Sequence, residues 1–193
     1  MMRYWILLGA VLLLVQGCAT HRTHYQLVYR NDRGGYQVQA PDWRAVKVHW
    51  HPYNVQVTTD SGQRKTVATE RLWGYKQTDG TLYRLYLGNT YEVVQEKTLT
   101  LYRQSDFGEG ATEHYFFSVT PDEPVLSLNR HNLEVAFAKY PCMQELIQQT
   151  PARNWLKTDH KSYRLIDSYD HCRQKSAGSQ LSTNDTPVSG HRP

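Results

Sequence analysis

The amino-acid sequence predicts an α+β fold, in which an antiparallel β-meander or partly closed barrel is followed by short C-terminal helices. Residues from about 25 to 119 are rich in β-branched and aromatic side chains, and turn signals recur roughly every eight to twelve residues. After residue 128 the apolar residues take the spacing of a helix. The composition allows such a fold, because 193 residues with 39% hydrophobic and 21% charged side chains describe neither a fully disordered chain nor a multi-span membrane protein.

The N-terminus is typical of a bacterial export signal. One cation, Arg3, precedes the uncharged segment Ile6–Val15, which as a helix would be only about 15 Å long and too short to cross a bilayer. The segment ends in Leu14-Val15-Gln16-Gly17-Cys18. This motif resembles the bacterial lipobox, and the resemblance implies cleavage between Gly17 and Cys18 and a diacylglycerol on the Cys18 sulfur. Residues 1–17 are then a signal peptide and residues 18–24 a lipidated tether.

Two other interpretations of this segment stay open: an ordinary signal peptide in which Cys18 is incidental, and an uncleaved N-terminal anchor. The residues after the cysteine, Ala19 and Thr20, are not acidic. By resemblance to lipoproteins of envelope bacteria, this implies a lipid-anchored protein at the outer membrane, on its periplasmic or its surface face. The membrane is therefore the first predicted partner. Nucleic acid is not expected, because the net charge of +4 is small and the basic residues are dispersed.

Strands are predicted in order along residues 25–119. In residues 46–51 the side chains alternate, with Val46, Val48 and Trp50 on a buried face and Lys47, His49 and His51 on a solvated face. Turns are expected at Asp60-Ser61-Gly62, Asp79-Gly80 and Gly88-Asn89. Further strands are expected at 72–77, 82–87, 91–96, 99–104 and 114–119. The short connections between them predict a meander.

Helices are predicted after these strands. Apolar residues at 133, 136, 137 and 140 form one helical stripe, with Asn129 as its N-cap. Pro141 ends that helix and begins a second one. A third helix is expected from the spacing of Leu165, Tyr169 and Cys172. We therefore predict a single α+β domain over 25–173, followed by a disordered polar tail over 174–193.

Three segments of the meander support a family resemblance. They are Leu72-Trp73-Gly74-Tyr75, Asp79-Gly80-Thr81-Leu82-Tyr83-Arg84 and Gly88-Asn89-Thr90-Tyr91-Glu92-Val93. These segments resemble the sequences of uncharacterised lipoproteins of Bacteroidetes-type bacteria, and the resemblance covers roughly residues 70 to 170. The resemblance implies a localisation and a fold, and it implies no activity.

The three cysteines separate into one lipid attachment site and one pair. If Cys18 carries lipid, Cys142 and Cys172 remain in an oxidising compartment, where a disulfide persists. We predict that they form a bridge, and two buried free thiols are the alternative. A catalytic cysteine is not expected, because the sequence has no Cys-x-x-Cys motif.

His49 and His51 are the candidate metal ligands. Alternation along a strand would place both rings on one face, close enough to share a metal ion. No third ligand stands at a fixed spacing from them, so solvent-facing histidines are the favoured interpretation and no metal site is predicted. Cofactors are likewise not expected.

Trp50, Trp73 and Tyr75 are the candidate ligand-binding residues, within a larger aromatic set that includes Trp43 and Tyr83. Such rings in strands mostly serve as half-buried packing, and in a patch they stack on sugars or contact proteins. The favoured prediction is a lipid-anchored envelope protein that acts as a structural or binding module. One alternative is a carbohydrate- or peptide-binding accessory of a surface uptake system, which leaves a protein or glycan partner open. The other is an enzyme without a recognisable motif. We do not predict an enzyme or any catalytic residue, because no nucleophile elbow or phosphate-binding glycine loop is present.

Overall fold

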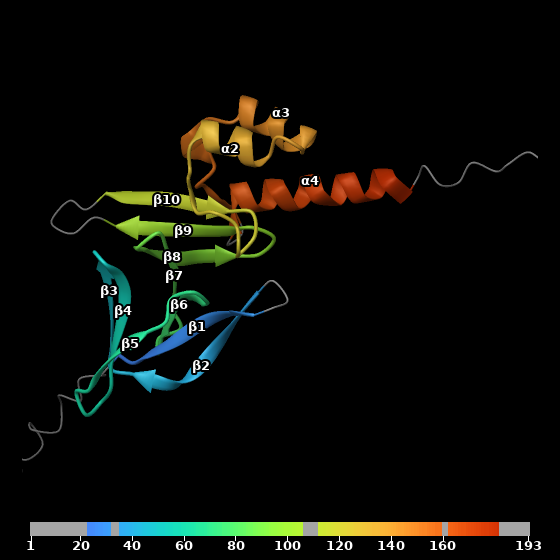
Figure 1. Cartoon of the computed structure of the whole chain (residues 1–193). Helices are drawn as coiled ribbons and strands as arrows, with labels where there is room; N and C mark the ends of the chain where they lie inside the picture. The colour runs from blue at the N-terminus through green and yellow to red at the C-terminus, as the bar shows by residue number, and fades with distance from the viewer. Residues whose placement is uncertain (1–22, 32–34, 106–111, 160–161, 182–193) are drawn as a thin grey trace, which may run out of the picture.

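The computed structural model describes residues 23–31, 35–105, 112–159 and 162–181, and it confirms the predicted α+β class. Antiparallel strands come first, and helices near the C-terminus lie against one end of the main sheet (Figure 1). Among the described residues the main sheet stays open, because β11 and β2 are its two edges. This open arrangement agrees with the prediction of an antiparallel meander or partly closed barrel.

The main sheet has eight strands in the order β11-β10-β9-β8-β7-β6-β1-β2. The strands are β1 Tyr25–Asn31, β2 Gly35–Trp43, β6 Leu72–Gln77, β7 Leu82–Tyr86, β8 Asn89–Glu96, β9 Thr100–Ser105, β10 Glu113–Ser118 and β11 Leu126–Ser127. From β6 to β11, each strand pairs with the next one along the chain. This is the meander expected from the short connections.

The β7–β8 turn differs by one residue from the predicted Gly88-Asn89. Tyr86 pairs with Asn89, so Leu87 and Gly88 are the two central residues of the hairpin. Their φ values of 46° and 78° are both positive, as a type I′ turn requires. Asn89 belongs to β8 because its backbone continues the ladder.

A second sheet contains β3 Ala45–Trp50, β4 Tyr53–Thr58 and β5 Arg64–Val67, in that order. Its inner face buries Val55 and Val57 completely against Leu27, Leu72 and Leu85 of the main sheet. We call β3–β5 the small sheet. It covers the β1–β6–β7 end of the main sheet.

The helical layer contains α2 Arg130–Ala136, α3 Pro141–Gln149 and α4 Arg164–Leu181, with the short elements η2 Ala152–Asn154, β12 Thr158–Asp159 and β13 Ser162–Tyr163 between them. Asn129 caps α2 by accepting a hydrogen bond from the backbone N–H of Asn132, and Pro141 begins α3, both as predicted. Helix α4 continues to Leu181, past residue 173 where the domain was expected to end and a disordered tail to begin. Residues 182–193 of that predicted tail lie outside the described residues. The first turns of α4 are fixed by packing of Leu165, Ile166 and Tyr169 in the core, and later residues such as Gln174 and Lys175 favour helix propagation.

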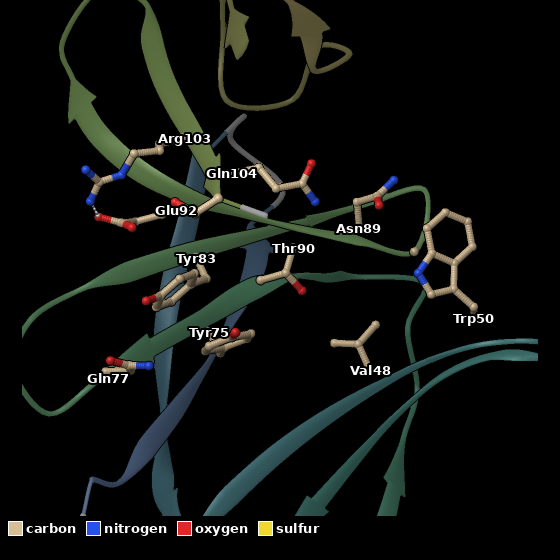
Figure 2. Close-up of a pocket in the computed structure, with 12 residues that line it drawn as sticks. Val48, Trp50, Tyr75, Gln77, Tyr83, Asn89, Thr90, Glu92, Arg103 and Gln104 are labelled. Carbon is tan, nitrogen blue, oxygen red and sulfur yellow. Dashed lines mark hydrogen bonds and ion pairs between the residues drawn. The ribbon is translucent and has the colours of Figure 1, made fainter. Parts of the chain in front are cut away.

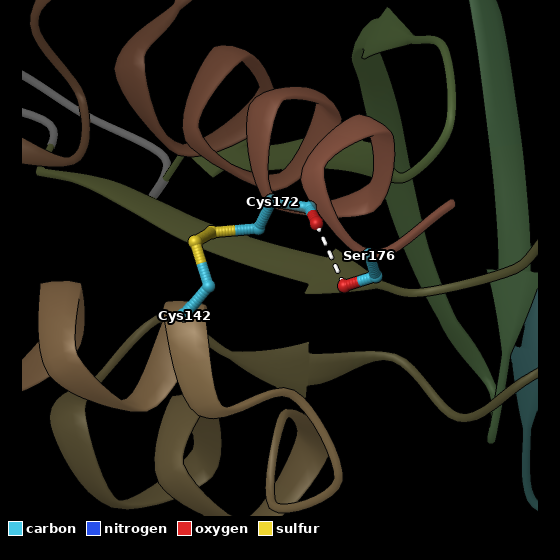
Figure 3. The surroundings of a disulfide bond; sticks show 3 residues. All are labelled: Cys142, Cys172 and Ser176. Carbon is cyan, nitrogen blue, oxygen red and sulfur yellow. Dashed lines mark hydrogen bonds between the residues drawn. A yellow bond between two sulfur atoms is a disulfide. The ribbon is translucent and has the colours of Figure 1, made fainter. Parts of the chain in front are cut away.

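Cys142 and Cys172 form a disulfide that joins α3 to α4 (Figure 3). Their Cα atoms lie 5.6 Å apart, which is an ordinary separation for a bridge. The two residues lie on separate helices that both pack on the sheet. The predicted pair is therefore brought together in the helical layer.

The helical layer and the small sheet pack on the same face of the main sheet. Cross-strand neighbours point to one face: Leu101 and Phe117 pair beneath the helices, while Leu27 pairs with Tyr75 beneath the small sheet. The register connects these two regions through Tyr75, Tyr83, Glu92 and Arg103, which pair in turn. The middle of this face lies between the two covering layers.

The opposite face buries an arginine. The Arg84 side chain is fully buried, and its guanidinium donates to the Tyr102 hydroxyl at 2.7 Å, the Ser118 hydroxyl at 3.1 Å and the Glu123 carbonyl at 2.6 Å. It also lies 5.4–5.7 Å from the ring centroids of Trp73, Tyr86 and Tyr102. Hydrogen bonds and aromatic rings, with no carboxylate among these contacts, therefore surround this cation.

Candidate ligand-binding groove

A cavity of about 540 Å³ lies over the middle of the main sheet, beside β3. We call it the groove. Strands β6–β9 form its floor, β3 forms one wall, and the β7–β8 turn closes one end (Figure 2). Its lining residues are Val48, Trp50, Tyr75, Gln77, Tyr83, Gly88, Asn89, Thr90, Glu92, Arg103, Gln104 and Ser105.

Two tyrosines form the centre of the groove floor. Tyr75 and Tyr83 are cross-strand partners, and their rings stack with centroids 5.0 Å apart. The rings of Tyr25 and Tyr75 make an edge-to-face contact with their centroids 5.7 Å apart. Burial raises the pKa of Tyr75 and of Tyr83, and the charge of Glu92 adds to the rise at Tyr83. Both rings therefore stay neutral phenols at physiological pH.

Trp50 forms the wall above this floor. Alternation predicted that Trp50 would be buried with Val46 and Val48, and this was wrong: 54% of its surface is exposed. Trp50 is the last residue of β3, beyond the part of the small sheet that packs on the main sheet. Its indole ring instead lies against Gly88, where a Cβ would come within 3.2 Å of two ring atoms. The small turn residue thus leaves room for a large, half-exposed ring at the turn end of the groove.

At one end of the groove, an arginine is paired with two glutamates. Arg103 donates to Glu92 at 2.7 Å and to Glu113 at 3.0 Å, and Tyr115 donates to the other oxygen of Glu113 at 2.7 Å. The hydrogen bond to Glu92 is the main reason that the pKa of Arg103 is raised. Burial and Glu113 raise the pKa of Tyr115 to about 12. The arginine therefore has carboxylate partners already.

Amide side chains supply the remaining polar surface of the groove. Gln77 is at the end of β6 and Gln104 near the end of β9. Within the described part of the chain, neither side-chain amide forms a hydrogen bond. Each presents a donor and an acceptor to whatever occupies the groove.

No protein-family model matches this chain, and the searches of curated proteins and of solved structures also find no match. The chemistry of the groove is therefore the basis for its functional interpretation.

The structure places two of the three candidate ligand-binding residues together. Trp50 and Tyr75 both line the groove, and Tyr83 joins them there. Trp73 does not, since only 1% of its surface is exposed. Its indole N–H donates to the Pro121 carbonyl at 2.9 Å, and Tyr36 stacks on its ring at 4.4 Å. Its candidacy for ligand binding was wrong, because burial and these contacts make it a packing residue.

The two candidate metal ligands do not share a strand face. His49 is in β3, whereas His51 follows the strand in the turn before Pro52, so the alternation ends between them. His49 is half-buried, which differs from the solvated position expected, and its Nε2 is buried without a hydrogen bond. Among the described residues there is no group of three or more histidine, cysteine, aspartate or glutamate side chains placed to hold a metal ion.

Gly17 and Cys18, the predicted cleavage and lipidation positions, lie outside the described residues. Within the described ranges, no helix is both long enough and apolar enough to cross a membrane.

Sequence reasoning missed Glu92, Arg103 and Gln104 as parts of the site. Each is one polar residue in an ordinary alternating strand, where a solvated position is the default expectation. Only their cross-strand neighbours bring them beside the tyrosines. Alternation did contain a signal once register is known, because Tyr83, Glu92 and Arg103 belong to the same face of the sheet as the buried Leu85 and Leu101.

Proposed function

We propose that this protein is a lipid-anchored binding protein of the bacterial cell envelope and that the groove holds its ligand. The observation that carries the proposal is the half-exposed Trp50 ring, which lines the same groove as the stacked Tyr75–Tyr83 pair and lies across the groove from it (Figure 2). Large rings that are fixed in position and still open to solvent are typical of binding sites. A concave site of this volume is in the range for small ligands.

A purely structural role would account poorly for Trp50. The other described tryptophans pack more deeply: Trp73 and Trp155 are each only 1% exposed, and Trp43 is half-buried against the cluster under the small sheet. Trp50 is instead left more than half exposed beside a cavity. The binding role is therefore favoured over the structural one.

The proposed lipid anchor is supported by the lipobox-like motif that ends at Cys18 and by the position of the first strand, which begins at Tyr25. Between Cys18 and Tyr25 the extended chain spans at most about 25 Å. His24 contacts Asp60 at 3.2 Å, and Tyr25 packs on Tyr75 of the groove floor. A lipid on Cys18 would thus hold the groove close to the bilayer surface.

The anchor is tested by metabolic labelling with an alkyne analogue of palmitate. The wild-type chain should be labelled and recovered with the membrane fraction, whereas Cys18→Ala should be unlabelled. Equal labelling of the two chains would refute the lipid anchor.

The binding site is tested by acrylamide quenching of tryptophan emission. Exposure makes Trp50 the most accessible indole described, so Trp50→Phe should remove most of the quenchable emission, and Trp43→Phe serves as the control. Three pools are then added: mixed oligosaccharides, a peptide digest and short-chain phospholipids. At least one pool should protect the Trp50 emission. If none does, the binding function is wrong and a structural role is left.

A further inference from the structure

We propose that the ligand of the groove is a neutral saccharide. This inference rests on the proposed binding function and adds the chemical class of the ligand. Four features of the groove support it: its charges are already paired, it has little aliphatic surface, its floor strands are hydrogen-bonded on both sides, and its lining combines aromatic rings with side-chain amides.

The charges of the groove favour an uncharged ligand. Among the described residues that line the groove, Arg103 is the only cation and Glu92 the only anion. They bind each other at 2.7 Å, and Glu113 occupies the other terminal nitrogen of the arginine. An anionic ligand would have to displace carboxylates from Arg103, and a cationic ligand would compete with Arg103 for Glu92. Neither charge is free to recognise a charged group.

The apolar surface of the groove does not suit an acyl chain. Within the described part of the lining, Val48 is the only aliphatic side chain of appreciable size, and the other large apolar side chains are the aromatic residues Trp50, Tyr75 and Tyr83. Lipid pockets need continuous aliphatic walls to replace water around a flexible chain. The groove offers separate flat platforms instead.

The floor also disfavours an extended peptide bound by strand addition. That mode needs an unpaired sheet edge. Strands β7 and β8 at the centre of the floor pair with neighbours on both sides, whereas among the described strands β3 of the wall pairs with β4 alone and has an unpaired second edge. The backbone groups of the floor are therefore engaged within the sheet, and a ligand on the floor is contacted through side chains. Strand addition of a peptide is left only the edge of β3, and the peptide library below tests that mode.

A neutral sugar ring suits the aromatic and amide side chains of the groove. Its C–H face is apolar and packs on the electron-rich face of an aromatic ring, and the half-exposed Trp50 in the groove lining supplies such a ring. Its hydroxyl groups both donate and accept hydrogen bonds, as do the amides of Gln77 and Gln104. These amides lack partners within the described residues, so they can meet hydroxyl groups without breaking internal bonds.

The test uses the full chain, purified from membranes in a detergent without a sugar head group, because maltoside or glucoside detergents would compete. The probes are neutral oligosaccharides (gluco-, manno-, xylo- and chito-oligosaccharides), anionic uronate oligosaccharides and a peptide library. Array hits are measured by isothermal titration. We expect a neutral oligosaccharide to bind and Trp50→Ala to weaken it about tenfold or more, as loss of an aromatic anchor does.

Tyr53→Ala is the matched control. Tyr53 is the cross-strand partner of Trp50 and is 41% exposed, but it does not line the groove. Its substitution should leave the affinity within about twofold. Gln104→Leu is the second variant, because it keeps the side-chain volume, removes the amide and should also weaken binding if Trp50→Ala fails to fold.

Each outcome decides between the proposals. Neutral-sugar binding that is lost in Trp50→Ala or Gln104→Leu and kept in Tyr53→Ala supports the inference. Sugar binding that none of the groove variants changes overturns it. Groove-dependent binding of uronates or peptides alone overturns the neutral-saccharide class and leaves the binding function standing. Absence of binding to every probe overturns the inference, and the quenching experiment then decides the binding function separately.

Discussion

Loss of the Cys142–Cys172 bridge is expected to lower the free energy of unfolding by about 3–4 kcal/mol. The two residues are 30 positions apart. In the chain-entropy treatment, closing a loop of that length removes about 12 cal/mol/K from the unfolded ensemble, or about 3.6 kcal/mol at 25 °C. For a domain of this size, that loss lowers the melting temperature by about 10 °C.

The measurement is guanidinium unfolding of the oxidised and the dithiothreitol-reduced wild type, followed by tryptophan emission. Reduction isolates the cross-link, because both sulfurs stay in place. The Cys142→Ala/Cys172→Ala variant adds a packing term, because Cys172 is 1% exposed within the helical core. It should be the least stable of the three.

Two results would refute this reasoning. One is agreement of the oxidised and reduced unfolding free energies within about 0.5 kcal/mol, which would mean that the cross-link does not restrict the unfolded chain. The other is titration of two free thiols in the mature oxidised protein under denaturing conditions, which would mean that the bridge does not form.

Three further predictions concern the core and the tyrosines. Arg84→Ala should lower the free energy of unfolding by about 3–5 kcal/mol in chemical denaturation, because it leaves a cavity and unpaired buried acceptors. Arg84→Met should restore part of that free energy. An Arg84→Ala variant as stable as the wild type would contradict the prediction. Gly74→Ala should abolish soluble folding, since the added Cβ would lie 1.9 Å from the Tyr83 carbonyl oxygen. Gly62→Ala is the control, because its Cβ would meet no atom within 4 Å. It should lower the free energy of unfolding by only about 1 kcal/mol, for its φ of +84°. Raised tyrosine pKa values mean that the folded protein holds these protons more tightly than the unfolded chain, so stability is complete below about pH 10 and falls as the pH rises toward the value of about 12 for Tyr115. Absorbance at 295 nm should show a later titration for the folded protein than for the protein in urea, and identical curves would contradict the prediction.

Much of the fold could be predicted because its signals are local. The strand at 72–77 and the N-cap at Asn129 agree with the structure residue for residue. Alternation and capping depend on neighbours within a few positions, which the sequence displays directly. The Trp50 prediction failed because alternation identifies a face without showing where the covering layer ends.

The groove could be predicted only in part. Trp50 and Tyr75 were candidates on residue type alone, as was Trp73, and the sequence offered no means of separating them. Their different positions come from long-range packing: Trp73 meets the Pro121 carbonyl, and Trp50 meets Gly88. These contacts join segments that are far apart in the chain.

By itself the sequence determined the fold class, the meander strands between residues 72 and 119, the N-cap at Asn129 and the pairing of Cys142 with Cys172. These follow from periodicity, from turn and cap chemistry and from counting, all of which are properties of short segments. Only the tertiary structure decided which aromatic rings stay open to solvent, that Arg103 is already neutralised by Glu92 and Glu113, and that Arg84 is buried. The physical reason is register: a side chain's neighbours on a sheet belong to other strands, and strand pairing and layer packing select them.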